Sequence, residues 1–294
     1  MKNALTDSEV LSRAFPSPAR NGHTPAQDWP LSVSMVLDGN VRLDAGALFG
    51  QAPWTVWSQL CSVDRQHRVH LSLCFPAVRT VDGITLLDAG LGNNIFRLAE
   101  ALYGRTVYKG PASMRELGLN SRKVTAVVLT SMATLSAGGL GKITTEGALD
   151  ARFPNARVYV QRAALEDFLA APAYSSPAYA GMPFDTFRRQ LQPLDGAAEI
   201  SPGIWALPAP GPLPGHQAVV VDTPKLKFIW PGAVIPTPWH LGGLVSNGHT
   251  DPRATLASRA QLLDRARRQG FELGLQMTAN VSRMHLKPGS PAGV

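Results

Sequence analysis

Short runs of hydrophobic residues, separated by residues that favour turns, follow one another after the first thirty residues. The segment SVSMVL precedes Asp38-Gly39, a pair typical of turns, and the runs VHLSLCFPAV and GITLLDAGLG come next. Runs of this length, rich in β-branched residues and bounded by turn signals, are typical of β-strands. Helical periodicity appears around residues 95–103 and 113–117, before a buried strand predicted over 123–130, KVTAVVLT.

The second half of the chain repeats this pattern. RVYVQ (157–161) predicts a strand, and AALEDFLAA after it predicts a helix. QAVVVDT and KLKFIW predict a hairpin with its turn at Thr223-Pro224, followed by a long helix over 254–269 and a last strand, FELGLQM. Two strand-rich halves, each with helices, predict an α/β protein of the αββα sandwich type.

The sandwich is predicted to be a single domain over residues 31–285, because no linker divides it. Residues 1–30 are rich in Pro, Ser, Asn and Ala without periodicity, which predicts a mobile N-terminal arm. Residues 286–294 are predicted to form a C-terminal tail. Residues 172–182, rich in Pro, Tyr and Ser, are a candidate lid.

Composition is that of a globular protein, with 45% hydrophobic and 17% charged residues. The net charge of +7 is spread along the chain, and its densest stretch, Arg259 to Arg268, has leucines at helical spacing. This pattern indicates the solvated side of an amphipathic helix, so nucleic acid is an unlikely partner. We expect a cytoplasmic protein, because no hydrophobic run reaches the roughly 20 residues of a membrane span and no secretion signal is recognisable. Cys61 and Cys74 are expected to be reduced thiols.

One stretch is more informative than any other: VTAVVLTSMATLSAGGL, in which a buried strand ends at Thr130 and Gly138-Gly139 follow. It resembles the signature of the metallo-β-lactamase superfamily, where such a strand ends in Thr-His-x-His-x-Asp-His-x-Gly-Gly. Similar segments lie in the family's order: LLDAGLG, FPNARVYVQ, PGPLPGHQ and FIWPGAVIPT. VRLDAGALFG and PWTVW resemble the branch that contains lactonases and organophosphate hydrolases. The resemblance spans roughly residues 35–282 and implies the αββα metallo-β-lactamase-type sandwich.

The family's metal ligands fall on residues that are poor zinc ligands or have no side-chain donor. These residues are Ser131, Ala133, Leu135, Ser136, Pro212, Ala233 and, in a looser alignment, Ala279 and Asn280. Zinc needs imidazole and carboxylate groups that converge from several loops. We therefore expect no metal and no other cofactor, and hydrolysis by metal-bound hydroxide is excluded on chemical grounds.

Three residues are candidates for catalysis. His240, in PTPWHL, follows the strand that carries the bridging aspartate in the family, and is the candidate general acid or base. Ser131 is a candidate nucleophile, although no Gly-x-Ser-x-Gly elbow surrounds it. His216 is the third candidate, although the histidine that it matches supports a loop in the family. The expected substrate-binding residues are Ala133, Thr134, Leu135, Ser136, Pro212, Ala233, Trp239 and Asn280.

Other residues near these positions have simpler expected roles. Asp88 in LLDAG is expected to accept hydrogen bonds from loop amides. Asn247 and His249, in SNGHTDP, lie on a loop that could reach the mouth of a pocket. The tryptophans that could wall a pocket or pack in the core are Trp54, Trp57, Trp230 and Trp239.

Two functions fit these residues. The first is a metal-free enzyme for the non-hydrolytic conversion of a small organic intermediate in secondary metabolism, by cyclisation, isomerisation, elimination or decarboxylation. The second is a non-catalytic protein that binds a small ligand or a protein partner. Replacement of charged ligands by Leu135, Ala133 and Ala233 predicts an apolar cavity, which favours the first. A homodimer is compatible with either.

Overall fold

Two large β-sheets organise the part of the chain that the computed structural model describes, which is residues 32–81, 83–93, 102–171, 177–278 and 282–286. The strands of the first sheet are β1 (Ser32–Asp44), β2 (Arg68–Thr80), β3 (Gly83–Leu87), β4 (Val107–Tyr108), β5 (Val124–Val128), β8 (Arg157–Gln161), β9 (Leu191–Leu194) and β15 (Met277–Thr278). Their order is β4-β1-β2-β3-β5-β8-β9, and β15 also pairs with β2. The strands β3, β5, β8 and β9 run parallel to one another.

The second sheet is built from the later part of the chain. Its strands are β10 (Ala198–Ser201), β11 (Ile204–Pro208), β12 (Gln217–Asp222), β13 (Lys227–Trp230), β14 (Glu272–Gly274) and β16 (Arg283–His285). They lie in the order β10-β11-β12-β13-β14-β16. A separate small hairpin pairs β6 (Gly141–Ile143) with β7 (Leu149–Ala151).

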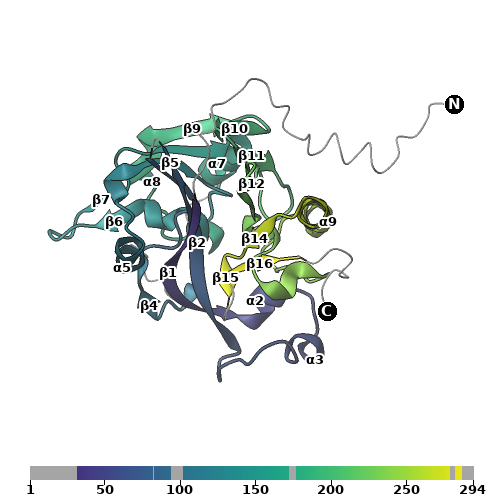
Figure 1. Ribbon diagram of the computed structural model, residues 1–294. Coiled ribbons are helices and arrows are strands. Elements are labelled where there is room, and N and C mark those ends of the chain that lie inside the picture. Colours follow the sequence, from purple (N-terminus) through teal and green to yellow (C-terminus); the bar gives the residue numbers. More distant parts are fainter. Residues whose placement is uncertain (1–31, 82, 94–101, 172–176, 279–281, 287–294) are drawn as a thin grey trace.

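Helices and 3-10 turns connect the strands, and α9 is the longest helix in the described part of the chain. The α-helices are α2 (Ala45–Phe49), α3 (Trp54–Trp57), α5 (Gly110–Glu116), α6 (Thr134–Ala137), α7 (Arg162–Ala170), α8 (Phe184–Phe187) and α9 (Pro252–Gln269). The 3-10 turns are η2 (Ser121–Lys123), η3 (Gly138–Leu140), η4 (Pro177–Tyr179), η5 (Arg188–Gln190), η6 (Gly232–Val234) and η7 (Pro238–Leu241). Figure 1 shows α5 outside the first sheet and α9 outside the second, with the sheets between them.

The central strands of the second sheet, β12 and β13, are buried on both faces, which explains their continuous hydrophobic runs. In β12, Val219 and Val221 belong to the core cluster shared with the first sheet, whereas Val220 belongs to the cluster that contacts α9. Successive side chains of a strand point to opposite faces, so this alternation places one layer of core on each side of the sheet. The predicted αββα sandwich is confirmed, as is the antiparallel hairpin of β12 and β13.

The predicted turn at Asp38-Gly39 is wrong, because β1 continues through it as one strand with a register shift between Leu37 and Gly39. The shift is a β-bulge. A Cβ at Gly39 would lie 2.0 Å from Val107 O, so glycine permits the close approach of β4. The buried carboxylate of Asp38 accepts the backbone N–H of Leu91 at 2.9 Å.

The predicted last strand is also different, because FELGLQM forms two short strands in different sheets. β14 pairs with β13 in the second sheet, and β15 pairs with β2 in the first. The predicted long helix is confirmed as α9, which begins with Pro252 after the N-cap Asp251 and ends at Gly270 in the left-handed conformation (φ 70°).

The described part of the chain contains no helix that is long and apolar enough to cross a membrane. The predicted N-terminal arm lies outside the described residues, as does the predicted tail from residue 287 onward. Of the candidate lid, residues 177–182 are described: they begin with η4, and the buried Ala180 follows it.

Candidate functional site

Four positions of the family's metal ligands lie together, at the ends of the parallel strands β3 and β5. The segment from Ser131 to Ser136 follows β5, and the loop containing Asp88 and Ala89 follows β3 beside it. The N–H of Ala89 donates to Ser136 O at 2.7 Å, and a Cβ at Gly139 would lie 1.9 Å from Ala89 O. Glycine at position 139 therefore allows the two loops to pack against each other.

Asp88 is the centre of a buried hydrogen-bond network at this place. Its Oδ1 accepts the backbone N–H of Thr130 at 2.7 Å, and its Oδ2 accepts the indole N–H of Trp230 at 2.7 Å. The Thr130 hydroxyl donates to Oδ2 at 2.9 Å, and Ser136 Oγ lies 3.2 Å from that hydroxyl. Burial raises the pKa of Asp88 to about 7, although hydrogen bonds from Thr130, Trp230 and Ser136 oppose this shift. The expected hydrogen bond to a loop amide is confirmed.

The other side chains of this segment are also used inside the protein. Ser131 Oγ accepts the N–H of Ala133 at 3.2 Å, and no base in the described part of the chain lies within hydrogen-bond distance of it. The hydroxyl of Thr134 donates to Ala180 O at 2.9 Å, and Leu135 packs into a hydrophobic cluster with α2. The geometry therefore gives Ser131 the role of a turn residue, without the base that a nucleophile needs.

His216 holds two loops of the second half together. Its Nδ1 lies 3.0 Å from Ala209 O, and its Nε2 lies 3.2 Å from the N–H of Ala233. A carbonyl can only accept, so Nδ1 carries the proton and Nε2 accepts. Burial lowers the pKa of His216 to about 3. With both nitrogens bonded, this histidine has no atom available for acid–base chemistry, and its position agrees with loop support.

His240 follows β13 in the chain, as expected, but its side chain is enclosed by the protein. It lies on η7, its side chain is fully buried, and Nδ1 is 2.8 Å from Thr237 Oγ1. Its Nε2 is 3.0 Å from Leu48 O and 3.2 Å from Ser246 Oγ. Burial lowers the pKa of His240 to about 3. The imidazole therefore connects η7 to the end of α2 and has no free nitrogen to offer a ligand.

The donor set at the family's ligand positions does not fit a zinc ion. Ala133, Leu135 and Pro212 have no side-chain atom that could bind zinc. The nearby carboxylate of Asp88 already accepts hydrogen bonds from Thr130 and other buried groups. Zinc in proteins takes thiolate, imidazole or carboxylate ligands. Within the described ranges, no three or more His, Cys, Asp or Glu residues are grouped so that they could hold a metal ion.

The purified protein is therefore expected to contain no stoichiometric zinc, iron or manganese. Added zinc should leave the melting temperature unchanged, because a ligand raises stability only when it binds the native state more tightly than the unfolded one. Elemental analysis and thermal unfolding with and without zinc test this, with chelator-treated protein as the control. A stoichiometric metal, or a rise in melting temperature on adding zinc, would contradict it.

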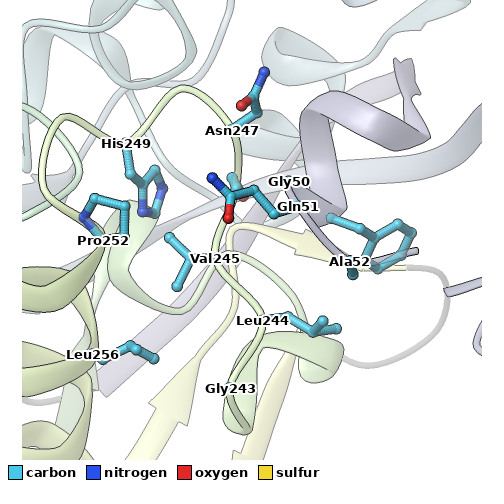
Figure 2. Close-up of a pocket in the computed structure, with 12 residues that line it drawn as sticks. Gly50, Gln51, Ala52, Gly243, Leu244, Val245, Asn247, His249, Pro252 and Leu256 are labelled. Carbon is cyan, nitrogen blue, oxygen red and sulfur yellow. The ribbon is translucent and has the colours of Figure 1, made fainter. Parts of the chain in front are cut away.

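A pocket of about 430 Å³ lies between the end of α2 and the segment that leads to α9 (Figure 2). The residues that line it are Phe49, Gly50, Gln51, Ala52, Gly243, Leu244, Val245, Ser246, Asn247, His249, Pro252 and Leu256. The two walls are joined by backbone contacts: the N–H of Asn247 donates to Ala47 O at 2.9 Å, and a Cβ at Gly50 would lie 2.1 Å from Val245 O. These contacts hold the two walls together.

The pocket is not formed by the residues that the sequence predicted for substrate binding. None of the described members of that set lines it, and Asn280 lies outside the described residues. The nearest link is Phe49, whose ring centre lies 5.5 Å from that of Trp239 and 6.2 Å from that of His240. Of the residues noted in the sequence, Asn247 and His249 do line the pocket.

Arg259 holds the loop that lines the pocket by hydrogen bonds to its backbone. Its Nε donates to Val234 O at 3.0 Å, and its Nη1 donates to Gly242 O and Leu244 O, each at 2.6 Å. The side chain is only 2% exposed, so the prediction that this arginine lies on the solvated side of the helix is wrong. Carbonyl groups 15 to 25 residues away accept its hydrogen bonds, which helical periodicity alone cannot show.

The tryptophans divide between core and surface. Trp230 is fully buried in the core between the sheets, and Trp57 stacks on Phe49 with ring centres 5.8 Å apart. Trp54 is 60% exposed. Sequence reasoning missed the pocket residues 49–52, which lie at the end of VRLDAGALFG and before PWTVW, and the resemblance of these two segments to the lactonase branch was the available signal. It also missed the lining residues at 243–246, 252 and 256, for which the sequence carried no such signal.

Comparison of the sequence with protein-family models and with curated proteins gives no match. Solved structures do match. A probable metal-dependent hydrolase from Staphylococcus aureus has a TM-score of 0.80 at 20% identity, over 89% of this chain and 94% of that one. AidC, a dizinc quorum-quenching lactonase, has a TM-score of 0.69 at 16% identity, over 90% of this chain and 94% of its own.

A third similar structure is the hydrolase AbOPH of the β-lactamase superfamily, with a TM-score of 0.70 at 16% identity, over 90% of this chain and 94% of that one. At these identities the likeness is one of fold, and it extends over nearly the whole of each chain. Together with the two facing sheets and their outer helices, it confirms the resemblance seen in the sequence: this chain has the metallo-β-lactamase fold.

Proposed function

We propose that the protein binds a small, uncharged organic molecule in the pocket between α2 and the Gly243–His249 loop, without a metal and without converting it. The observation that supports this most strongly is the pocket itself, whose volume of about 430 Å³ is typical of a small-molecule site. The ligand positions of the fold are, in contrast, occupied by residues without a polar side chain, such as Ala133 and Leu135, or by serines whose hydroxyls bond within the protein.

The chemistry of the lining favours an uncharged, partly apolar ligand. Phe49, Leu244 and Val245 supply apolar surface, whereas Gln51 and Asn247 supply polar but neutral groups. No Asp, Glu, Lys or Arg is among the residues that line the pocket in the described part of the chain. A charged ligand would lose its hydration without gaining an ionic partner, which is costly.

The similar structures suggest a first probe. AidC was solved with the product N-hexanoyl-L-homoserine, and another structure of this fold with N-decanoyl-L-homoserine at its active site. The lactone of the first compound is an uncharged acyl amide, and its ring-opened form carries a carboxylate. The lactone and its ring-opened form differ mainly in charge, so their affinities test directly whether the pocket prefers an uncharged ligand.

The alternative is an enzyme for the cyclisation, isomerisation, elimination or decarboxylation of a small intermediate in secondary metabolism. Such chemistry needs an acid or base that reaches the ligand. His240, the residue expected to supply it, has both ring nitrogens bonded inside the protein. The geometry therefore does not support His240 as the acid or base, and a product detected by mass spectrometry after incubation would favour the enzyme instead.

Calorimetric titration with N-hexanoyl-L-homoserine lactone and a panel of uncharged amides of similar size tests the proposal. We expect binding of the lactone at least about tenfold tighter than of its ring-opened anion, because burial of an unpaired charge is unfavourable. Gly243→Phe should abolish binding: a Cβ at Gly243 meets no atom within 4 Å, so the ring can occupy the pocket without strain.

Gly248→Phe is the matched control. Gly248 lies on the same loop, is also exposed, and also has open space around an added Cβ, but it does not line the pocket. This variant should bind the lactone as the wild type does. Failure of the wild type to bind any compound of the panel, or unchanged binding by Gly243→Phe, would contradict the proposed function.

A further inference from the structure

The protonation of His249 can be assigned from its neighbours. The hydroxyl of Thr255 donates its one proton to the carbonyl of Asp251 at 2.9 Å, and a carbonyl can only accept. The same hydroxyl oxygen lies 3.1 Å from Nδ1 of His249, so it can only accept there. The proton of the imidazole is therefore on Nδ1, which leaves Nε2 as an unprotonated acceptor.

This chain of hydrogen bonds is held by the start of α9. Asp251 is the N-cap of the helix, and its side chain accepts the N–H of Ala254 at 2.9 Å. Thr255 is fully buried, and a Cβ at Gly211 would lie 2.2 Å from its nitrogen, so its position is fixed by packing. A fixed threonine fixes the orientation of the imidazole that donates to it.

The imidazole faces the pocket. Figure 2 shows the ring of His249 and the carboxamide of Gln51 extending from opposite walls toward the middle of the pocket. Burial and the positive charge of Arg259 lower the pKa of His249 to about 4, so its ring is neutral at neutral pH. Ser246, another polar residue of the lining, donates its hydroxyl proton to Leu48 O at 2.9 Å, so that proton is already used within the protein.

We propose that the pocket selects ligands with an N–H or O–H group, which donates a hydrogen bond to Nε2 of His249. This inference rests on the proposed function and names the chemistry of the ligand. An amide or alcohol fits both parts of the site, because its apolar portion can contact Phe49 and Leu244 while its donor reaches the imidazole. An acceptor placed at the same point would face the nitrogen lone pair and be repelled.

A pair of ligands that differ in one atom tests this on the full chain. The probes are N-hexanoyl-L-homoserine lactone and its ester analogue, in which oxygen replaces the amide N–H. The wild type should bind the amide about tenfold more tightly, and His249→Leu should bind both with equal affinity, because the acceptor is lost. A merely structural histidine would weaken both compounds by the same factor and leave their ratio unchanged.

Two further measurements separate the possible failures. Nitrogen NMR of the wild type without ligand should show His249 protonated at Nδ1, with only the Nε2 resonance of that ring moving strongly when the amide binds. Binding of both compounds with equal affinity, or a proton found on Nε2, would overturn the inference and leave the proposed function intact. Binding of neither compound, nor of any other uncharged amide, would overturn both.

Discussion

Replacement of Asp88 by alanine is expected to lower the free energy of unfolding by about 4 kcal/mol at neutral pH, because buried donors lose their acceptor. The backbone N–H of Thr130 and the indole N–H of Trp230 both donate to this carboxylate, and both residues are fully buried. Asp88 also has a positive φ of 64°, a conformation that aspartate tolerates better than alanine does.

His67→Ala is the control that separates backbone conformation from lost hydrogen bonds. Among the described residues other than glycine, His67 also has a positive φ, of 57°, and its side chain is exposed. Its replacement should cost about 1 kcal/mol or less. Urea unfolding followed by tryptophan fluorescence and circular dichroism measures both variants. Equal losses in the two variants would mean that the Asp88 network contributes little to stability.

The network stabilises the fold at the positions where the metallo-β-lactamase signature has its metal ligands. A loop that carries several ligands is normally fixed by the ion that they bind. In this chain the loop after β5 is fixed instead by Asp88, by the bond of Thr134 to Ala180 O, and by the packing of Gly139 against Ala89. All of these contacts use groups within the protein, so no ion is needed to satisfy them.

The strands were predictable because their burial on both faces produces a continuous run of hydrophobic residues in the sequence. β12 and β13 are buried on both faces, and their uninterrupted hydrophobic residues express this directly. The bulge at Gly39 was not predictable, since it depends on a carbonyl of β4, at Val107. Asp38 looked like a turn residue, but its carboxylate bonds to an amide 53 residues away.

The candidate site was predicted in part for the same reason. The ligand positions from Ser131 to Ser136 are contiguous in sequence, so alignment to the family's signature was enough to bring them together. His240 was assigned from its distance to a strand, but its partner Leu48 is 192 residues away, and burial of the imidazole follows from that contact. His249 was noted only as a loop residue, because its bond to Thr255 depends on how the loop meets α9.

The pH dependence of stability should reveal Asp88 separately from the histidines. The pKa of Asp88 is about 7 in the folded protein because of burial, against an ordinary value of 3.8. Between these values the folded state keeps a proton that the unfolded chain has released, so its contribution to stability is present at low pH and is lost as pH rises. Asparagine at this position cannot titrate, so Asp88→Asn removes this effect.

Three histidines with lowered pKa values act in the opposite direction. The pKa values of His216 and His240 are lowered to about 3, and that of His249 to about 4, mainly by burial. Their ordinary value is 6.5, so the unfolded chain takes up protons below that pH that the folded state does not, and acid destabilises the protein. In the wild type Asp88 offsets part of this loss. In Asp88→Asn the full loss should appear.

Relative to the wild type, the free energy of unfolding of Asp88→Asn should therefore rise by about 1.4 kcal/mol per pH unit between about pH 4.5 and about pH 6.5. Urea unfolding at several pH values in this range measures the difference between the two proteins, in which the common histidine contribution cancels. Asp185→Asn is the control, because its side chain is 87% exposed, and its profile should run parallel to that of the wild type. Parallel profiles for Asp88→Asn and the wild type would show that Asp88 is ionised throughout this range, with its hydrogen-bond donors outweighing the effect of burial.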